Sequence, residues 1–167
     1  MKSFFIFIFT CCAIQLAAQN DSLQPPYKRF PSVPPFKLML TDSSTIFSKA
    51  DLKKKTPLWI IMFSPDCDHC KHETEELVKQ IDKFKKVQIV MATTYPVREI
   101  KKFYEQYALN RFPQITMGRD HYFLLPPFFD MHSFPFLAFY DKQGKLISVF
   151  EGNLPVEKVA ELFAKEQ

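Results

Sequence analysis

The chain has 167 residues, with 22 Lys and Arg against 18 Asp and Glu, which gives a formal net charge of +4. It contains no block of about six like charges and no basic stripe, and this balance argues against a nucleic-acid-binding protein. With 19 Phe and only 3 Gly, a chain of this length fits one domain with a sizeable core.

Residues 1–19 have the layout of a secretory signal peptide. Lys2 precedes a short apolar run, and small residues ending at Ala18 come just before a polar stretch. The apolar run is shorter than the roughly 20 residues that a membrane-spanning helix needs. We therefore predict cleavage near Ala18 or Gln19 and export to the periplasm or cell envelope.

Removal of this leader would leave two of the four cysteines. Cys11 and Cys12 lie within it, and a lipid on one of them is the alternative to simple cleavage; only such an anchor would attach the protein to a membrane. Cys67 and Cys70 remain, and an oxidising compartment converts such cysteines to disulfides. A disulfide across two residues constrains little chain entropy, so a chemical role explains the pair better than a structural one.

Residues 20–35 are rich in proline, with five prolines between Gln24 and Pro35. Because proline fixes φ and lacks a backbone donor, we predict an extended arm rather than a helix or a central strand. The polar stretch 41–57 is typical of a short hairpin or loop that leads into the core. We assign residues 36–167 to a single folded domain.

The centre of the chain alternates strand and helix patterns. The apolar runs 58–63 and 87–92 are typical of strands that are buried on both faces. Between them, apolar residues recur at helical spacing from Cys70 to Phe84, which predicts an amphipathic helix of about 18 residues. The order strand–helix–strand implies a right-handed parallel crossover.

The last third of the chain has a different pattern. Pro96 begins a second amphipathic helix, and 114–117 is a candidate short strand. The runs 135–140 and 145–150 flank a four-residue turn and are therefore antiparallel. Pro155 begins a terminal helix. Together these elements predict an α/β fold with a central mixed β-sheet flanked by helices.

The segment SPDCDHC, residues 64–70, places the cysteine pair directly after a buried strand and at the first turn of a helix. Unpaired backbone N–H groups and the helix dipole favour an anion there, so we expect a stabilised thiolate and a nucleophilic role for Cys67. Cys70 is one turn deeper on the buried stripe, where it can attack a mixed disulfide at Cys67. The pair is predicted to exchange disulfides.

Three neighbouring side chains are predicted to tune this thiolate. Protonated His69 would stabilise it and make the disulfide more oxidising. Asp66 and Asp68 bring like charge beside it and oppose that effect. Because each effect is small at a partly solvated site, the sequence leaves the direction of the redox reaction open.

The segments LWIIMFSPDCDHCKHE (58–73) and SFPFLAFYDKQGKLISVFEG (133–152) together resemble the thioredoxin superfamily. Within it the chain is most similar to exported TlpA/ResA-like thiol-disulfide oxidoreductases. The resemblance implies a thioredoxin-like fold from about Phe36 to the C-terminus. It also implies that Cys67 is the attacking thiol, that Cys70 is the resolving thiol, and that the two form a redox disulfide.

The same resemblance assigns roles to three further residues. Pro135, after Phe134, matches a cis-proline that faces the dithiol, and both residues would line the groove that holds the substrate chain. Glu73 matches an acidic residue beside the active site. Its helical angle independently places it near Cys70, where partial burial would raise its pKa and suit it to proton transfer.

Metal binding is the main competing interpretation of the cysteine pair. A structural zinc site needs four ligands, and neither a second C-x-x-C nor a His-x-x-x-His motif is present. Thioredoxin-fold copper chaperones use cysteines three apart, which is a different spacing. His72 is expected on the solvated helix face and His132 in a loop. We therefore predict no metal and no organic cofactor.

The sequence thus predicts an exported, monomeric thiol-disulfide oxidoreductase that acts on protein thiols or disulfides and is regenerated by a dithiol redox partner. Its substrate and its direction, reductase or oxidase, stay open. The alternative is a non-catalytic thioredoxin-fold binding module that holds a peptide in a Phe-rich groove.

Overall fold

The computed structural model describes residues 24–165; the predicted leader and the first residues of the arm lie outside this part. The strands are β1 (Lys37–Leu40), β2 (Ile46–Ser48), β3 (Leu58–Met62), β4 (Gln88–Thr93), β5 (Ile115–Asp120), β6 (Phe136–Tyr140) and β7 (Leu146–Glu151). The α-helices are α2 (Pro26–Arg29), α3 (Asp68–Lys79), α4 (Val97–Gln106), α5 (Leu125–Phe129) and α6 (Val156–Ala164). Three short 3₁₀ helices complete the described elements, η1 (Lys49–Asp51), η2 (Ile81–Phe84) and η3 (Leu109–Arg111).

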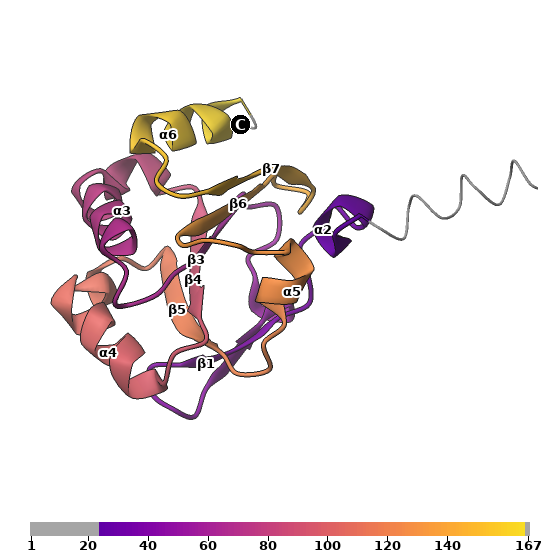
Figure 1. Cartoon of the computed structure of the whole chain (residues 1–167). Helices are drawn as coiled ribbons and strands as arrows, with labels where there is room; N and C mark the ends of the chain where they lie inside the picture. Colours follow the sequence, from indigo (N-terminus) through magenta and orange to yellow (C-terminus); the bar gives the residue numbers. More distant parts are fainter. Residues whose placement is uncertain (1–23, 166–167) are drawn as a thin grey trace, which may run out of the picture.

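The strands form one mixed sheet in the order β2-β1-β5-β4-β3-β6-β7. β3, β4 and β5 are parallel to one another, whereas β6 pairs antiparallel with β3 and β7 with β6. This confirms the predicted α/β class, the parallel crossover through α3 and the antiparallel C-terminal pair. Helices cover both faces of the sheet (Figure 1).

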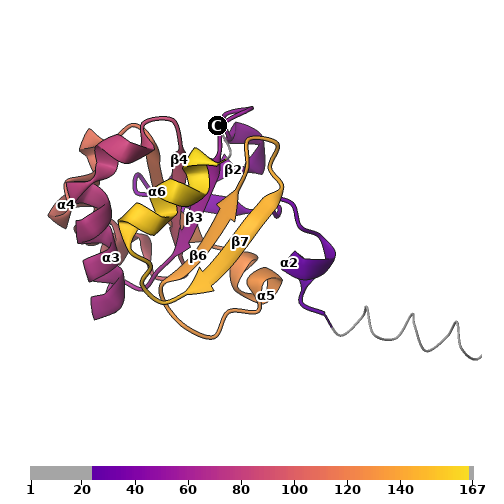
Figure 2. The same ribbon diagram turned by 90° about the horizontal axis from the view of Figure 1, so that it is seen from above.

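Both faces of the central strands are buried because their side chains alternate between two cores. In β3, Trp59 and Ile61 enter the core under α3, α4 and α6, where the Trp59 ring lies 5.3 Å from that of Phe84. Leu58 and Ile60 enter the second core, which α2 and α5 cover. Figure 2 shows α3, α4 and α6 on one side of the sheet and α2 and α5 on the other.

The helix after the cysteines is shorter than the sequence predicts. The α-helical part ends at Lys79, and the buried stripe continues through η2. At Gln80 the N–H donates to the carbonyls of both Glu76 and Leu77, so the hydrogen bonding changes there from the α-helical to the 3₁₀ pattern. The stripe itself is confirmed, since its members are all buried: Cys70, Thr74, Leu77, Ile81 and Phe84.

The prediction of a wholly extended arm is wrong for α2. Pro26 stands at the first helical position, where a missing N–H costs nothing, and the Phe30 N–H donates to the Pro26 carbonyl at 2.8 Å. Beyond this turn, Ser32 pairs with Lys145 and Val33 is buried in the second core. In the described part of the arm, α2 therefore packs on α5, and the residues after it pack against the sheet.

Candidate active site

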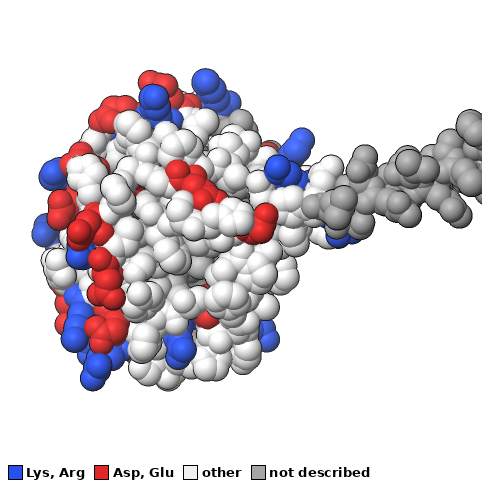
Figure 3. Space-filling model, in the orientation of Figure 1, with Lys and Arg blue, Asp and Glu red and all other residues white. Residues whose placement is uncertain are grey.

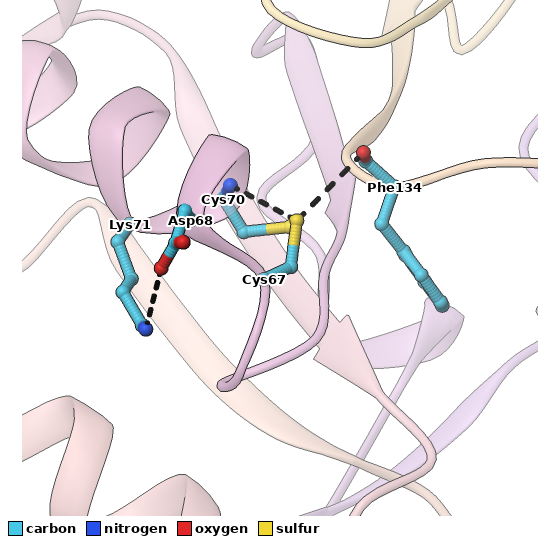
Figure 4. Close-up of polar contacts among 5 residues, drawn as sticks. All are labelled: Cys67, Asp68, Cys70, Lys71 and Phe134. Atoms are coloured by element: carbon cyan, nitrogen blue, oxygen red, sulfur yellow. Dashed lines mark hydrogen bonds and ion pairs between the residues drawn. The ribbon is translucent and has the colours of Figure 1, made fainter.

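The two cysteines lie where β3 passes into α3. Cys67 is the residue that caps α3, and its Sγ accepts a hydrogen bond from the Cys70 backbone N–H at 3.3 Å (Figure 4). This contact satisfies one of the N–H groups that a helix start leaves unpaired. Cys67 is partly exposed, Cys70 is only 1% exposed, and both are free thiols.

The loop before β6 faces the cysteines from the other side of the site. The Phe134–Pro135 peptide bond is cis, as predicted. The Phe134 carbonyl oxygen lies 3.8 Å from Cys67 Sγ, within reach of a weak S–H···O hydrogen bond. In Figure 4 this carbonyl points toward the sulfur while the Phe134 ring extends away from it.

Burial changes the chemistry of Cys70. It raises the pKa of this thiol, and the hydrogen bond with Cys67 raises it further. Cys70 therefore stays a neutral thiol at neutral pH unless a base removes its proton. Glu73 follows it by three residues on α3 and so lies on the same side of the helix.

Glu73 is more deeply buried than the sequence predicts, with only 3% of its surface exposed. Its Oε2 accepts hydrogen bonds from Asn153 Nδ2 at 3.0 Å and from the Leu154 N–H at 3.3 Å. Its Oε1 is buried and has no hydrogen-bond partner among the described residues. Burial raises the pKa of Glu73, and the bonds from Asn153 and Leu154 offset only part of this rise.

Asn153 is a site residue that the sequence analysis missed. Its Nδ2 donates to the His69 carbonyl at 2.7 Å as well as to Glu73, so it ties the first turn of α3 to the segment between β7 and α6. No motif marks it, because its partners are 80 or more residues away in the chain. The only local signal is a polar residue in a short connection next to an active-site strand.

The residues predicted to tune the thiolate, Asp66, Asp68 and His69, all have exposed side chains. Asp68 forms an ion pair with Lys71 at 2.9 Å, and Lys71 lowers the pKa of Asp68. The negative charge nearest the helix start is thus partly compensated by its own neighbour. Because these side chains are exposed, solvent weakens the effect of their charges on the Cys67 thiolate.

A second missed residue, Glu151 of β7, holds the loop that carries the cis bond. Its Oε2 accepts from Ser133 Oγ at 2.7 Å, and its Oε1 accepts from the His132 N–H at 3.4 Å. The Gly152 N–H also donates to the Pro135 carbonyl at 2.8 Å. Three hydrogen bonds therefore fasten the loop opposite Cys67, two to Glu151 at the end of β7 and one to Gly152 just after it.

The surface around the loop before β6 and the end of β7 carries few charged side chains. In the view of Figure 3, charged side chains gather over α3 and α4, whereas the central surface is mostly uncharged. Phe134 is 37% exposed, while Phe129 and Phe136 are buried core residues. Of the two residues predicted to line the groove, Phe134 has an exposed ring, whereas Pro135 is buried.

Two further properties concern the described residues alone. Residues 24–165 contain no group of three or more His, Cys, Asp or Glu side chains placed to hold a metal ion. None of the helices in this part is long and apolar enough to cross a membrane.

A dithiol that caps a helix after a buried parallel strand, opposite a cis-proline, defines a thioredoxin-type site. A family model described as a thioredoxin-like domain matches residues 45–167, and the chain belongs to this family. The resemblance inferred from the two sequence segments is confirmed. No curated protein matches the chain.

Several solved structures share the fold. The secreted disulfide oxidoreductase of Mycobacterium tuberculosis homologous to E. coli DsbE has 19% identity and a TM-score of 0.65, covering 78% of this chain and 95% of its own. StoA from Bacillus subtilis has 17% identity and a TM-score of 0.60, covering 79% and 98%. A thioredoxin-family thiol:disulfide interchange protein from Chlorobium tepidum has 14% identity and a TM-score of 0.66, covering 86% and 97%. At these identities the likeness concerns the fold.

Proposed function

We propose that the protein is an exported thiol-disulfide oxidoreductase that exchanges disulfides with protein substrates. The observation that carries the proposal is the placement of the two sulfurs. Cys67 Sγ is partly exposed, caps α3 and faces the Phe134 carbonyl at 3.8 Å, while Cys70 is buried one turn behind it. A substrate can reach the first sulfur and not the second.

In the reducing direction, the Cys67 thiolate attacks a substrate disulfide, forms a mixed disulfide and releases one substrate thiol. Cys70 then gives its proton to the Glu73 carboxylate and attacks the Cys67 sulfur. The bond between Cys67 and the substrate breaks, the second substrate sulfur leaves as a thiolate that takes a proton from water, and the Cys67–Cys70 disulfide forms. Two electrons pass to the substrate, and a dithiol protein returns them. The oxidising reaction is the reverse of these steps.

The surrounding residues have supporting roles in this proposal. The exposed Phe134 ring contacts the substrate chain and the backbone before β6 pairs with it, while the buried Pro135 holds the cis turn that presents them. His69, Asp66 and Asp68 adjust the stability of the Cys67 thiolate from the solvent side. No metal or organic cofactor is required, because the dithiol itself carries the electrons.

Export is part of the proposal. It is supported by the Lys2–Ala18 pattern, and the M. tuberculosis protein with the same fold is described as secreted. We place this protein in the periplasm or cell envelope as a monomer, attached to a membrane only if Cys11 or Cys12 carries a lipid. An intact mass beginning at Gln19 or Asn20 in the envelope fraction would support cleavage, and an uncleaved cytosolic chain would contradict it.

Trapping of mixed disulfides tests the reaction itself. Cys70→Ala should accumulate substrates on Cys67, whereas Cys67→Ala should trap almost none, because Cys70 is buried. Non-reducing gels of envelope extracts followed by mass spectrometry would identify the adducts. If Cys70→Ala traps no protein and the native pair shows neither reductase nor oxidase activity, the non-catalytic binding module replaces this proposal.

A further inference from the structure

A hollow of about 530 Å³ lies between α3 and the start of α6, and neither Cys67 nor Cys70 lines it. Its lining on α3 is His72, Glu73 and Glu76, and its opposite wall is the segment 153–157 that leads from β7 into α6. The exchange reaction proposed above assigns no role to this hollow. Among its lining residues, Glu73 is the buried carboxyl that follows Cys70 by one turn of α3.

The hollow and the substrate surface lie on different sides of α3. Cys67 faces the loop before β6, whereas Glu73 faces Asn153 and Leu154. Six positions along an α-helix correspond to an angle of about 120° around its axis, which agrees with this separation. A polypeptide bound over Cys67 and Phe134 would therefore leave the hollow open to water.

The two carboxyl oxygens of Glu73 have different surroundings. Oε2 is held by Asn153 Nδ2 and the Leu154 N–H, both from residues that line the hollow. Oε1 is buried without a hydrogen-bond partner among the described residues and is free to take a proton. A proton taken up on Oε1 therefore reaches the hollow when the protonated carboxyl group turns, because Oε2 already accepts two hydrogen bonds on that side.

The other charges at the rim are already compensated. Glu76 forms an ion pair with Lys79 at 2.7 Å, and Glu157 forms one with Lys83 at 3.5 Å. His72, which is exposed, places an imidazole at the rim, and this group both accepts and donates protons. Glu73 is therefore the carboxyl in this wall that has no ion-pair partner.

We propose that the hollow is the exit through which the proton of Cys70 reaches water by way of Glu73, so that the resolving step proceeds while a substrate covers Cys67. The inference rests on the proposed exchange reaction. In that step Cys70 loses its proton to Glu73, its thiolate attacks the Cys67 sulfur, and the substrate thiolate leaves. Glu73 then passes the proton to water or to His72 at the hollow and returns to the carboxylate form. In the oxidising direction the proton enters by the same route.

Chemical rescue tests the route, with Ellman's reagent as the disulfide substrate. The first release of thionitrobenzoate reports attack by Cys67, and the second reports attack by Cys70. Glu73→Ala should slow only the second phase, by about 100-fold, which is the lower end of general acid–base effects. Formate, a small carboxylate that can enter through the hollow, should restore much of the second-phase rate in proportion to its concentration.

Blocking the hollow supplies the control. His72→Trp in the Glu73→Ala background should abolish rescue by formate, whereas Glu75→Trp should preserve it, because Glu75 is exposed on α3 outside the hollow. If Glu73→Ala fails to fold, the same two Trp variants are compared with Glu73 intact. His72→Trp should then slow the second phase and Glu75→Trp should not.

The outcomes separate the two proposals. Equal rescue, or an equal second-phase rate, in the two Trp variants would overturn the exit route while leaving disulfide exchange in place. Absence of both phases in the wild-type protein would instead overturn the proposed function.

Discussion

Replacing Glu73 with Gln should change how the stability of the protein depends on pH. Burial raises the pKa of Glu73 in the folded protein, whereas in the unfolded chain the carboxyl titrates near its ordinary value of 4.5. Between these two values the folded state binds more protons than the unfolded state, so the free energy of unfolding falls as pH rises. Glu73→Gln cannot ionise and should lack this decline.

The magnitude follows from the same linkage. Each unit by which the folded pKa exceeds 4.5 lowers the free energy of unfolding at neutral pH by about 1.4 kcal/mol relative to that at acidic pH. The Gln carbonyl can keep the bonds from Asn153 and Leu154, but its NH₂ would replace the unpartnered Oε1. That replacement costs about 1–3 kcal/mol at every pH. The test is therefore the change of the free energy of unfolding with pH, not the constant difference between the variant and the wild type.

Urea unfolding of the reduced protein from about pH 4 to about pH 8 measures this slope. Glu76→Gln on the same helix is the matched control, because Lys79 lowers the pKa of Glu76. That ion pair stabilises the fold above the ordinary pKa and is lost as pH falls, so this variant should shift the slope in the opposite sense. Parallel stability curves for the wild type and Glu73→Gln would refute the account of a buried carboxyl with a raised pKa.

Two further variants test packing, one beside Glu73 and one between β5 and β1. Asn153→Ala removes the donor to Glu73 and His69 and should lower the free energy of unfolding by about 2–4 kcal/mol. Asn110→Ala, at an exposed position, is the control. If urea unfolds Asn153→Ala and the wild type at the same concentration, Asn153 does not bridge the two segments. In Gly118→Ala the new Cβ would lie 2.8 Å from Leu38 Cβ and 2.9 Å from the Met39 carbonyl oxygen. The forced shift of β1 should cost about 1–3 kcal/mol, and an unchanged Tm would show that β1 moves aside freely.

The central strands could be predicted because their sequence patterns reflect burial on both faces. Runs such as 58–63 contain no polar residue that would have to face water. Parallel strands joined through helices are the common arrangement in which both faces of such a strand are buried. The cysteines could be placed for the same reason, since they directly follow one of these strands. Pro135 could be identified because its segment matches a known motif at the expected distance.

The short helices α2 and α5 could not be predicted, because each spans about one turn and is rich in proline and aromatic residues. Such segments have no helical period, and they adopt their shape by packing, as Tyr27 does against Phe129 with ring centroids 6.3 Å apart. Asn153 and Glu151 were missed for a different reason. Each acts on residues that only the folded sheet brings near; the sole local signal for Asn153 is its polar side chain in a short connection, and the segment that contains Glu151 does not single it out.

The pairing of β3 with β6 has a consequence for the durability of the site. Met62 of β3 lies opposite Phe136 of β6, so this pair of central strands positions Cys67 and Phe134, which are 67 residues apart in the chain. Edge strands open more readily than central ones in the fluctuations that hydrogen exchange detects. Opening of β2, at the far edge of the sheet, should therefore leave the gap between the sulfur and the carbonyl unchanged, whereas opening of β7, whose Glu151 holds the Phe134 loop, should widen it.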